Sequence, residues 1–292
     1  MTISPRILIT GITSIHGWPL YRALKERLPE NALYGLRSPK SLSPSGHNIA
    51  AACITDTIAL SAIYEQFKPT HIIHAAGVCD LDVCEERPQW ARILNVLGTK
   101  RLLDVFGTTA RFIYISTDLV FSGNNPPDGG YCEDNSVDPV SIAGITFAEA
   151  EDIVIKHDKA CIVRLGLPIG RSITGTKGAL DFIEGRLKRG VKTSLFYDEI
   201  RSCISCKIIG DILWRLINND ATGIYNLGGD KSVSLYDIGR YVAKLGNYNE
   251  NLLTSLARFE EKNGPPRIGN VTLNSSKIKK TLGIESISNG MD

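Results

Sequence analysis

The sequence predicts an α/β protein with a doubly wound parallel sheet and a smaller carboxy-terminal lobe. Short apolar runs of strand length alternate with longer segments whose apolar residues recur at helical spacing. The first apolar run leads through a glycine-containing turn directly into a helical segment. Strands that alternate with helices in this way are typical of parallel sheets covered on both faces. The 292 residues are enough for about two domains, or one large domain with a lobe.

The predicted elements follow one another in a regular order. We expect short apolar strands over residues 6–10, 31–37, 70–77, 111–117 and 160–166. Amphipathic helices are expected between them, over residues 17–28, 56–67, 86–107 and 144–157. After residue 167 the alternation loosens, with a further strand expected at 223–229 and helices at 234–246 and 275–283. We therefore expect the sheet domain to span residues 1–166 and the lobe residues 167–292, with some segments returning to the sheet.

The charge balance and the hydropathy pattern exclude several classes of protein. The 33 Lys and Arg residues nearly balance the 31 Asp and Glu residues, so the chain has no general basic field for nucleic acid. No apolar run approaches the ~20 residues of a membrane helix. Residues 1–17 lack the pattern of a signal peptide. We therefore expect a cytoplasmic protein with no nucleic-acid or membrane partner.

The seven cysteines are expected to be reduced thiols. An odd number of cysteines in a large chain without a secretion signal argues against a disulfide framework. Cys203 and Cys206 form a single Cys-x-x-Cys pair, with no second pair or Cys/His cluster nearby. Free cysteine packs as a small apolar residue. We therefore expect no metal site.

The turn after the first strand has the form of a dinucleotide-binding loop. It reads TGITSIHG from Thr10 to Gly17. Gly11 permits the tight turn, Gly17 permits close packing of helix on strand, and the helix N-terminus offers N–H groups to a pyrophosphate. Ser14, followed by Ile15, replaces the glycine that lets the phosphates approach the backbone. The alternative is a glycine-capped turn without a ligand.

The end of the second strand favours NADP(H) over NAD(H). The acidic residue that would accept hydrogen bonds from the ribose of NAD is absent there. Arg37, with Ser38 and Lys40 behind it, can instead bind a 2′-phosphate, because a guanidinium matches phosphate oxygens bidentately. A solvated basic loop, and a protein without a cofactor, stay open as alternatives.

Several segments taken together resemble the extended short-chain dehydrogenase/reductase family, and within it the dTDP-4-dehydrorhamnose reductase branch. The matching segments occur in family order and cover nearly the whole chain: TGITSIHG, HAAGVCDLDVCEERP, LNVLGTKRLL, YISTDLVFSG, GGYCEDNSVDP, AGITFAEAE, RSCIS, GIYNLGG and PRIGNVTLNSSKIKKTLG. The resemblance implies a Rossmann domain that binds a nicotinamide dinucleotide and a lobe that binds a nucleotide-linked 4-keto sugar. It also implies cofactor contacts from Ala75, Ala76 and Gly77.

The same resemblance implies hydride transfer by a catalytic set of an Asn, a hydroxyl residue, a Tyr and a Lys. Asn95 matches the Asn, and Thr117, followed by Asp118, matches the hydroxyl residue. The family's YGxTK segment aligns with AGITF, so Ala143 stands at the Tyr position and Phe147 at the Lys position. A ketone that receives hydride needs a proton donor, and general acid catalysis is worth about 10²–10⁴-fold. We therefore expect the ordinary reductase reaction to be impaired.

Two arginines carry the resemblance on the substrate side. Arg201, in RSCIS, and Arg267, in PRIGNV, match residues that clamp the diphosphate of a nucleotide sugar in related enzymes. A pair of guanidiniums suits a diphosphate, because each can donate two parallel hydrogen bonds. The alternative is a pair of surface arginines.

Three functions stay open on this basis. The first is an NADP(H)-dependent oxidoreductase with atypical or impaired chemistry, acting on a nucleotide-linked 4-keto sugar or descended from such enzymes. The second is a non-catalytic regulatory or partner-binding protein, for which the regulatory beta subunit of methionine adenosyltransferase, similar to the same branch, is a precedent. The third is a non-redox isomerase or cyclase on the same scaffold. The partner would be a nucleotide sugar or related small molecule, a second copy in a homodimer, or another protein.

Overall fold

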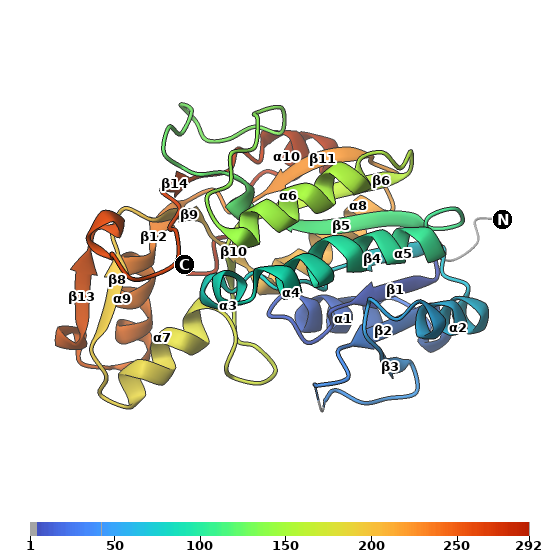
Figure 1. Cartoon of the computed structure of the whole chain (residues 1–292), viewed down its shortest axis with the longest axis horizontal. Coiled ribbons are helices and arrows are strands. Elements are labelled where there is room, and N and C mark those ends of the chain that lie inside the picture. Colours follow the sequence, from blue (N-terminus) through green and yellow to red (C-terminus); the bar gives the residue numbers. More distant parts are fainter. Residues whose placement is uncertain (1–4, 42, 292) are drawn as a thin grey trace.

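The computed structural model describes residues 5–41 and 43–291. Its centre is a sheet of seven strands in the order β11-β6-β5-β4-β1-β2-β3, and every neighbouring pair is parallel (Figure 1). The strands are β1 (Ile7–Thr10), β2 (Leu33–Arg37), β3 (Ile49–Ala51), β4 (His71–His74), β5 (Arg111–Thr117), β6 (Ala160–Leu165) and β11 (Gly223–Leu227). The strand order reverses between β1 and β4, which is where such sheets bind ligands at their carboxyl edge.

Helices cover both faces of this sheet, so the predicted doubly wound α/β class is confirmed (Figure 1). One face is covered by α2 (Thr57–Phe67), α5 (Gly98–Phe106) and α6 (Ile142–Val154), and the other by α1 (Gly17–Lys25), α8 (Cys206–Ile217) and α10 (Ser276–Leu282). Side chains alternate along β1, because Leu8 joins the first core while Ile7 and Ile9 join the second. The parallel strands are therefore buried on both sides.

The lobe has its own apolar core. It is built on α7 (Ala179–Lys188) and α9 (Leu235–Gly246), which pack together through Leu180, Ile183, Ile238 and Val242. Its short strands are β7 (Pro168–Ile169), β8 (Thr193–Phe196), β9 (Ile200–Ser202), β10 (Ile204–Ser205), β12 (Ser232–Ser234), β13 (Leu253–Leu256) and β14 (Asn270–Val271). Between these pieces the chain returns to the main sheet through α8, β11 and α10.

The long helix expected over residues 86–107 is present as one continuous helical segment over residues 88–106, with a π-helical turn inside it. That segment contains α4 (Pro88–Arg92), a π-helical turn (Ile93–Leu97) and α5, and a separate short helix α3 (Leu81–Glu86) precedes it. Single 3-10 turns occupy Glu30–Ala32, Asp118–Val120, Glu250–Leu252 and Arg258–Glu260. Asn95 lies in this π-helical turn, and its side chain accepts a hydrogen bond from Val78 in the chain after β4.

Strand β3, the short lobe strands and the helices α7 and α8 also lie outside the predicted set. The two helices fall in the stretch where the alternation loosens, although α8 packs closely on α1. A Cβ added at Gly210 of α8 would lie 2.4 Å from the Cβ of Ala23, so the two helices approach nearly backbone to backbone.

The structure also bears on the expected membrane and cysteine properties. Within the part of the chain that the structure describes, no helix has the length and apolar character needed to span a bilayer. All seven cysteines are free. Among the described residues, no group of His, Cys, Asp and Glu side chains is arranged to hold a metal ion.

Candidate functional site

The loop after β1 packs against the chain that leaves β4. Gly11 has φ +68°, and a Cβ there would lie 2.5 Å from the carbonyl oxygen of Ala75, so only glycine fits. The Thr10 hydroxyl is hydrogen-bonded to Nδ1 of His74 at 2.7 Å and accepts from the backbone N–H of Ala76 at 3.2 Å. The structure therefore brings Thr10, Gly11, Ala75 and Ala76 together at the carboxyl edge of the sheet.

Ser14 is accommodated because its hydroxyl turns back into the loop. Its Oγ accepts from the N–H of Gly17 at 2.9 Å, and its own N–H donates to the carbonyl of Gly11 at 2.9 Å. The residue that replaces the middle glycine therefore satisfies one N–H of the first helical turn. The backbone N–H groups of Ile15 and His16 have no hydrogen-bond partner in the described part of the chain. Two free N–H donors at a helix N-terminus fit a diphosphate.

His16 contributes no charge to this loop. It precedes the first residue of α1, and neither of its ring nitrogens has a hydrogen-bond partner among the described residues. Burial lowers the pKa of His16 to about 4, so the imidazole is neutral near pH 7. A positive group facing a phosphate here has to come from another part of the chain.

Arg37 lies at the end of β2 and is folded onto the following loop. One terminal nitrogen donates to the carbonyl oxygens of Ser38, at 3.3 Å, and of Ser41. Its buried Nε has no partner within residues 5–41 and 43–291. The hydroxyl of Ser38 accepts from the N–H of Lys40 at 3.3 Å. The guanidinium thus retains an unsatisfied donor beside its two carbonyl contacts, and a 2′-phosphate would be a better acceptor than a neutral carbonyl.

Asn95 holds two elements together. Its Oδ1 accepts from the N–H of Val78 at 2.8 Å, and its Nδ2 donates to the carbonyl of Val78 and the hydroxyl of Thr146, each at 2.9 Å. The residue is 1% exposed. The family's Asn position therefore joins the chain after β4 to α6 in this protein, and both N–H bonds of the amide are already used.

An apolar wall stands at the positions where the resemblance places Tyr and Lys. Ala143 and Phe147 are both buried on α6. The Cζ atom of Phe147 would lie 3.0 Å from a Cβ on Gly77, so the ring covers the chain just after β4. On its other side the ring stacks on Tyr114, with centroids 6.1 Å apart and planes inclined by 22°. Neither position offers a proton donor or a cation.

The two arginines expected to clamp a diphosphate lie in a chain of buried ion pairs. Nε of Arg201 donates to Asp118 at 2.7 Å, a second nitrogen pairs with the other carboxylate oxygen, and Glu199 lies 3.7 Å away. Glu199 in turn accepts from Nε of Arg267 at 2.9 Å and from its terminal nitrogen at 2.7 Å. Asp118, Arg201, Glu199 and Arg267 thus alternate in sign between the end of β5 and the lobe. Glu199 was not singled out from the sequence, where its only signal is its place two residues before Arg201.

The pKa shifts in this chain follow from burial and from the neighbouring charges. Burial raises the pKa of Glu199, and the nearby guanidiniums of Arg267 and Arg201 offset only part of that effect. Burial lowers the pKa of Arg201, but Asp118 and Glu199 more than offset it, and the pKa is raised overall. The Thr117 hydroxyl donates to Asp118 at 3.2 Å and accepts from the N–H of Leu119 at 3.3 Å. The hydroxyl at the family's catalytic position therefore borders this ion chain.

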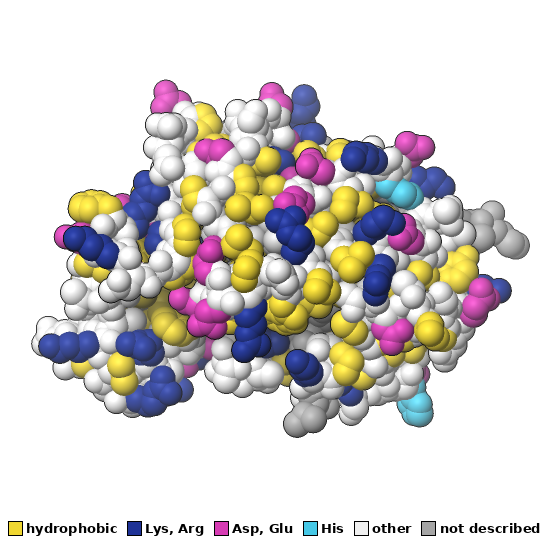
Figure 2. Space-filling view, viewed as in Figure 1, with side chains coloured by type: hydrophobic (Ala, Val, Ile, Leu, Met, Phe, Trp, Pro, Cys, Tyr) yellow, Lys and Arg dark blue, Asp and Glu magenta, His cyan; other side chains and the backbone are white. Residues whose placement is uncertain are grey.

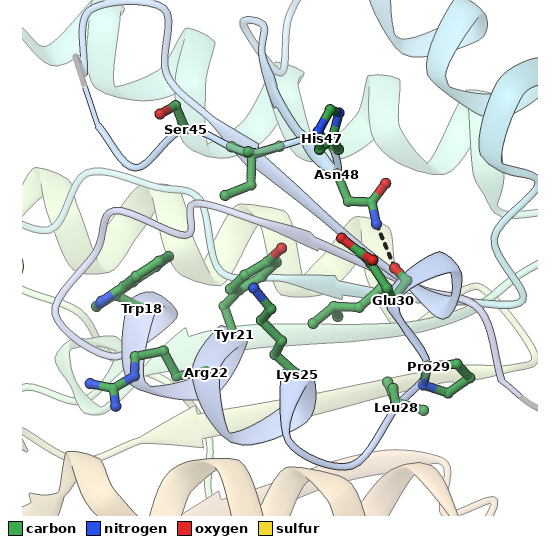
Figure 3. A pocket seen from close by; sticks show the side chains of 13 residues that line it. Trp18, Tyr21, Arg22, Lys25, Leu28, Pro29, Glu30, Ser45, His47 and Asn48 are labelled. Atoms are coloured by element: carbon green, nitrogen blue, oxygen red, sulfur yellow. Dashed lines mark hydrogen bonds between the residues drawn. The ribbon is translucent and has the colours of Figure 1, made fainter.

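A separate hollow of about 400 Å³ lies beside α1 and contains none of the predicted site residues (Figure 3). Its floor is the helix, with Trp18 and Tyr21 stacked at 5.6 Å, and residues 45–49 cover it. Lys25 and Glu30 stand at its edge. The predicted cofactor and catalytic residues instead gather where β1, β4 and β5 end.

A parallel sheet that reverses its order beside β1, and carries a glycine loop at that point, is the architecture of Rossmann-like proteins of the short-chain dehydrogenase/reductase type. The chain belongs to the RmlD substrate binding domain family, whose match spans residues 5–288.

Two kinds of curated protein are similar to the chain over most of its length. The methionine adenosyltransferase 2 subunit beta of Xenopus laevis is 28% identical over 96% of this chain and 83% of that protein. A dTDP-4-dehydrorhamnose reductase of Aggregatibacter actinomycetemcomitans is 26% identical over 96% and 94%. The solved dTDP-4-dehydrorhamnose reductase of Bacillus anthracis, in complex with NADP, has a TM-score of 0.80 at 21% identity and covers 99% of this chain and 96% of that one.

Proposed function

We propose that this protein is an NADP(H)-binding, reductase-like protein of the dTDP-4-dehydrorhamnose reductase type whose hydride-transfer chemistry is impaired. The observation that carries the proposal is the apolar wall of Ala143 and Phe147 beside an otherwise formed dinucleotide loop. Family membership and a solved relative in complex with NADP support the cofactor class.

The cofactor proposal is supported by donors from two elements. The free N–H groups of Ile15 and His16 suit the diphosphate, and Arg37 at the end of β2 suits a 2′-phosphate. Bound NADPH would supply a hydride to a carbonyl carbon. Thr10, Ala75 and Ala76 fix the backbone on which the dinucleotide would rest, and Ser14 keeps its hydroxyl out of the way.

The impaired chemistry follows from what surrounds a bound carbonyl. The carbonyl oxygen gains negative charge as hydride arrives, and it needs a nearby proton donor or cation. Alanine supplies neither, and the phenyl ring of Phe147 cannot hold a ribose hydroxyl or lower the pKa of a phenol. Thr117 stands at the position where the family has its catalytic hydroxyl, and this hydroxyl donates a hydrogen bond to Asp118.

Two measurements on the purified protein test this proposal. Calorimetry with NADP⁺ and NAD⁺ should give micromolar binding with NADP⁺ preferred, and Arg37→Leu should remove that preference. NADPH oxidation with a dTDP-linked 4-keto sugar should proceed well below about 1 s⁻¹, the low end of ordinary turnover. Turnover in the ordinary range would contradict the impaired chemistry, and binding of neither dinucleotide would contradict the cofactor.

A second function, a non-catalytic partner-binding subunit, is supported by the buried ion chain. Asp118 and Glu199 occupy the guanidiniums of Arg201 and Arg267 that would otherwise meet a diphosphate. A related protein is by name a subunit of a larger enzyme. This function predicts no binding of dTDP or UDP by calorimetry, and a stable complex with one defined protein. Micromolar binding of either nucleotide would count against it.

A further inference from the structure

The segment between β7 and α7 reaches from the lobe to the dinucleotide loop. In Figure 1 this loop descends beside α1 before the chain enters α7. Gly178, its last residue, has φ +85°, and a Cβ there would lie 2.1 Å from Cδ1 of Ile15. Residues 171–178, here termed the strap, therefore pack directly on the first turn of the dinucleotide site.

The strap is held in shape by one buried carboxylate. Oδ2 of Asp181, on α7, accepts from the hydroxyl of Ser172 at 2.5 Å and from the backbone N–H groups of Ser172 and Lys177, at 3.0 and 3.3 Å. The Ser172 hydroxyl also accepts from the N–H groups of Thr176 and Lys177, at 3.2 and 3.1 Å. These bonds fix the backbone of Lys177 relative to α7, so the position of its side chain is set by the lobe.

The side chain of Lys177 ends at the dinucleotide loop. Its Nζ donates to the carbonyl oxygen of Thr13 at 3.3 Å, a long bond to a neutral acceptor. No acidic side chain pairs with it within residues 5–41 and 43–291, and the residue is exposed. An ammonium group has three donors, so most of its hydrogen-bonding capacity and its whole charge are uncommitted. The neighbouring His16 is neutral, and Phe147 stands where the family has its lysine.

We propose that Lys177 is a cofactor-binding residue that neutralises the diphosphate of a dinucleotide bound at residues 10–17. This inference rests on the proposed NADP(H) binding and adds the lobe to the cofactor site. The diphosphate would meet the free N–H groups of Ile15 and His16 on one side and the ammonium of Lys177 on the other. A compact ammonium is a common phosphate ligand. The lobe therefore contacts the bound cofactor directly, through Lys177, which lies 160 or more residues after the loop at residues 10–17.

Calorimetry on Lys177→Gln with three nucleotide probes tests this assignment. NADP⁺ carries both a diphosphate and a 2′-phosphate, ADP-ribose carries only the diphosphate, and adenosine 2′-monophosphate carries only the 2′-phosphate. We expect Kd for NADP⁺ and ADP-ribose to rise about tenfold, as for the loss of one charge-assisted hydrogen bond. The Kd for adenosine 2′-monophosphate should stay within twofold. Lys192→Gln, an exposed lysine on the same lobe, is the matched control and should change none of the three.

The outcomes separate this inference from the function on which it rests. Wild-type protein that binds NADP⁺ while Lys177→Gln binds it equally well would overturn the role of Lys177 and leave the cofactor proposal intact. An equal loss for adenosine 2′-monophosphate would overturn the assignment to the diphosphate. Wild-type protein that binds no dinucleotide would overturn the proposed function and the inference with it. Circular dichroism of each variant confirms that the comparison is between folded proteins.

Discussion

Replacing Asp118 with asparagine should destabilise the protein strongly, because it leaves Arg201 without its main partner. The Asp118 side chain is fully buried and that of Arg201 is 8% exposed, so water cannot solvate the remaining guanidinium. Breaking a buried ion pair by removing one member typically costs about 3–5 kcal/mol. Here Glu199 remains 3.7 Å from Arg201, and asparagine keeps one acceptor oxygen. We therefore expect the low end, about 3 kcal/mol.

That loss translates into a measurable shift of the melting temperature. An unfolding entropy of about 2.1 cal/mol/K per residue gives about 0.6 kcal/mol/K for 292 residues. A loss of about 3 kcal/mol then corresponds to a decrease of about 5 °C. The assay is urea unfolding at pH 7, followed by far-UV circular dichroism, with a thermal scan as a second readout.

The control is an exposed ion pair between a lysine and an aspartate. Lys100 and Asp104 pair at 2.7 Å on the surface of α5, with both side chains more than half exposed. Asp104→Asn should cost less than about 0.5 kcal/mol. If Asp118→Asn is no more destabilising than Asp104→Asn, the ion chain is not a buried structural element and the reasoning is refuted. The Asp118→Leu/Arg201→Met double variant should recover much of the loss, because no unpaired charge remains.

Three further predictions concern titration, chemistry and backbone. Burial lowers the pKa of His74 from 6.5 to about 3. Between those two pH values the imidazole takes up a proton only in the unfolded chain, so the free energy of unfolding falls as the pH drops below 6.5. Between pH 7 and pH 5 the free energy of unfolding of His74→Gln should therefore fall by about 2 kcal/mol less than that of the wild type. Urea unfolding at both pH values measures this, and equal decreases would contradict it. The Ala143→Tyr/Phe147→Lys double variant should reduce a dTDP-linked 4-keto sugar at least about 100-fold faster than wild type in an NADPH oxidation assay, whereas an unchanged rate in a folded variant would show that these positions do not limit turnover. Gly11→Ala should lose at least about 2 kcal/mol in urea unfolding, because its Cβ would lie 2.5 Å from a backbone oxygen at φ +68°. Gly185→Ala, which meets nothing within 4 Å on α7, should instead gain up to about 1 kcal/mol, and similar values for the two glycines would refute the steric argument.

The loop at residues 10–17 and the residues of α6 differ in how they depart from the family pattern. The dinucleotide loop keeps its backbone geometry although Ser14 replaces a glycine, because the hydroxyl caps Gly17 within the loop. The two positions on α6 at which the resemblance places Tyr and Lys are part of the apolar core, with Phe147 stacked on Tyr114. A buried phenyl ring packs well at this place, where a lysine would need a partner. Figure 2 shows that the exterior over this face mixes apolar side chains with charges of both signs.

Local residue patterns determined the sheet and the loop at its edge. The apolar runs, their spacing and the glycine turn are encoded within a few residues of each element, so they predict the parallel sheet, the order of most elements and the position of the dinucleotide loop. The pattern over residues 86–107 predicts the helix itself but indicates neither the π-helical turn at Ile93–Leu97 nor the short helix α3 that precedes it. Helix α8 was missed although its buried residues Ile209, Ile212 and Leu216 recur at helical spacing.

Only the tertiary structure decided which charges meet. Arg201 and Arg267 were recognised in the sequence, but their partners Asp118 and Glu199 lie on other strands or segments that folding brings together. Lys177 carries no motif at all, and its proximity to Thr13 comes from the placement of the lobe over the sheet. Side-chain partners separated by 80 or more residues depend on packing of whole elements, and no local pattern encodes them. The local apolar periodicity of the sequence therefore predicts the fold of this protein. The arrangement of charges at its site depends on how the sheet and the lobe pack together.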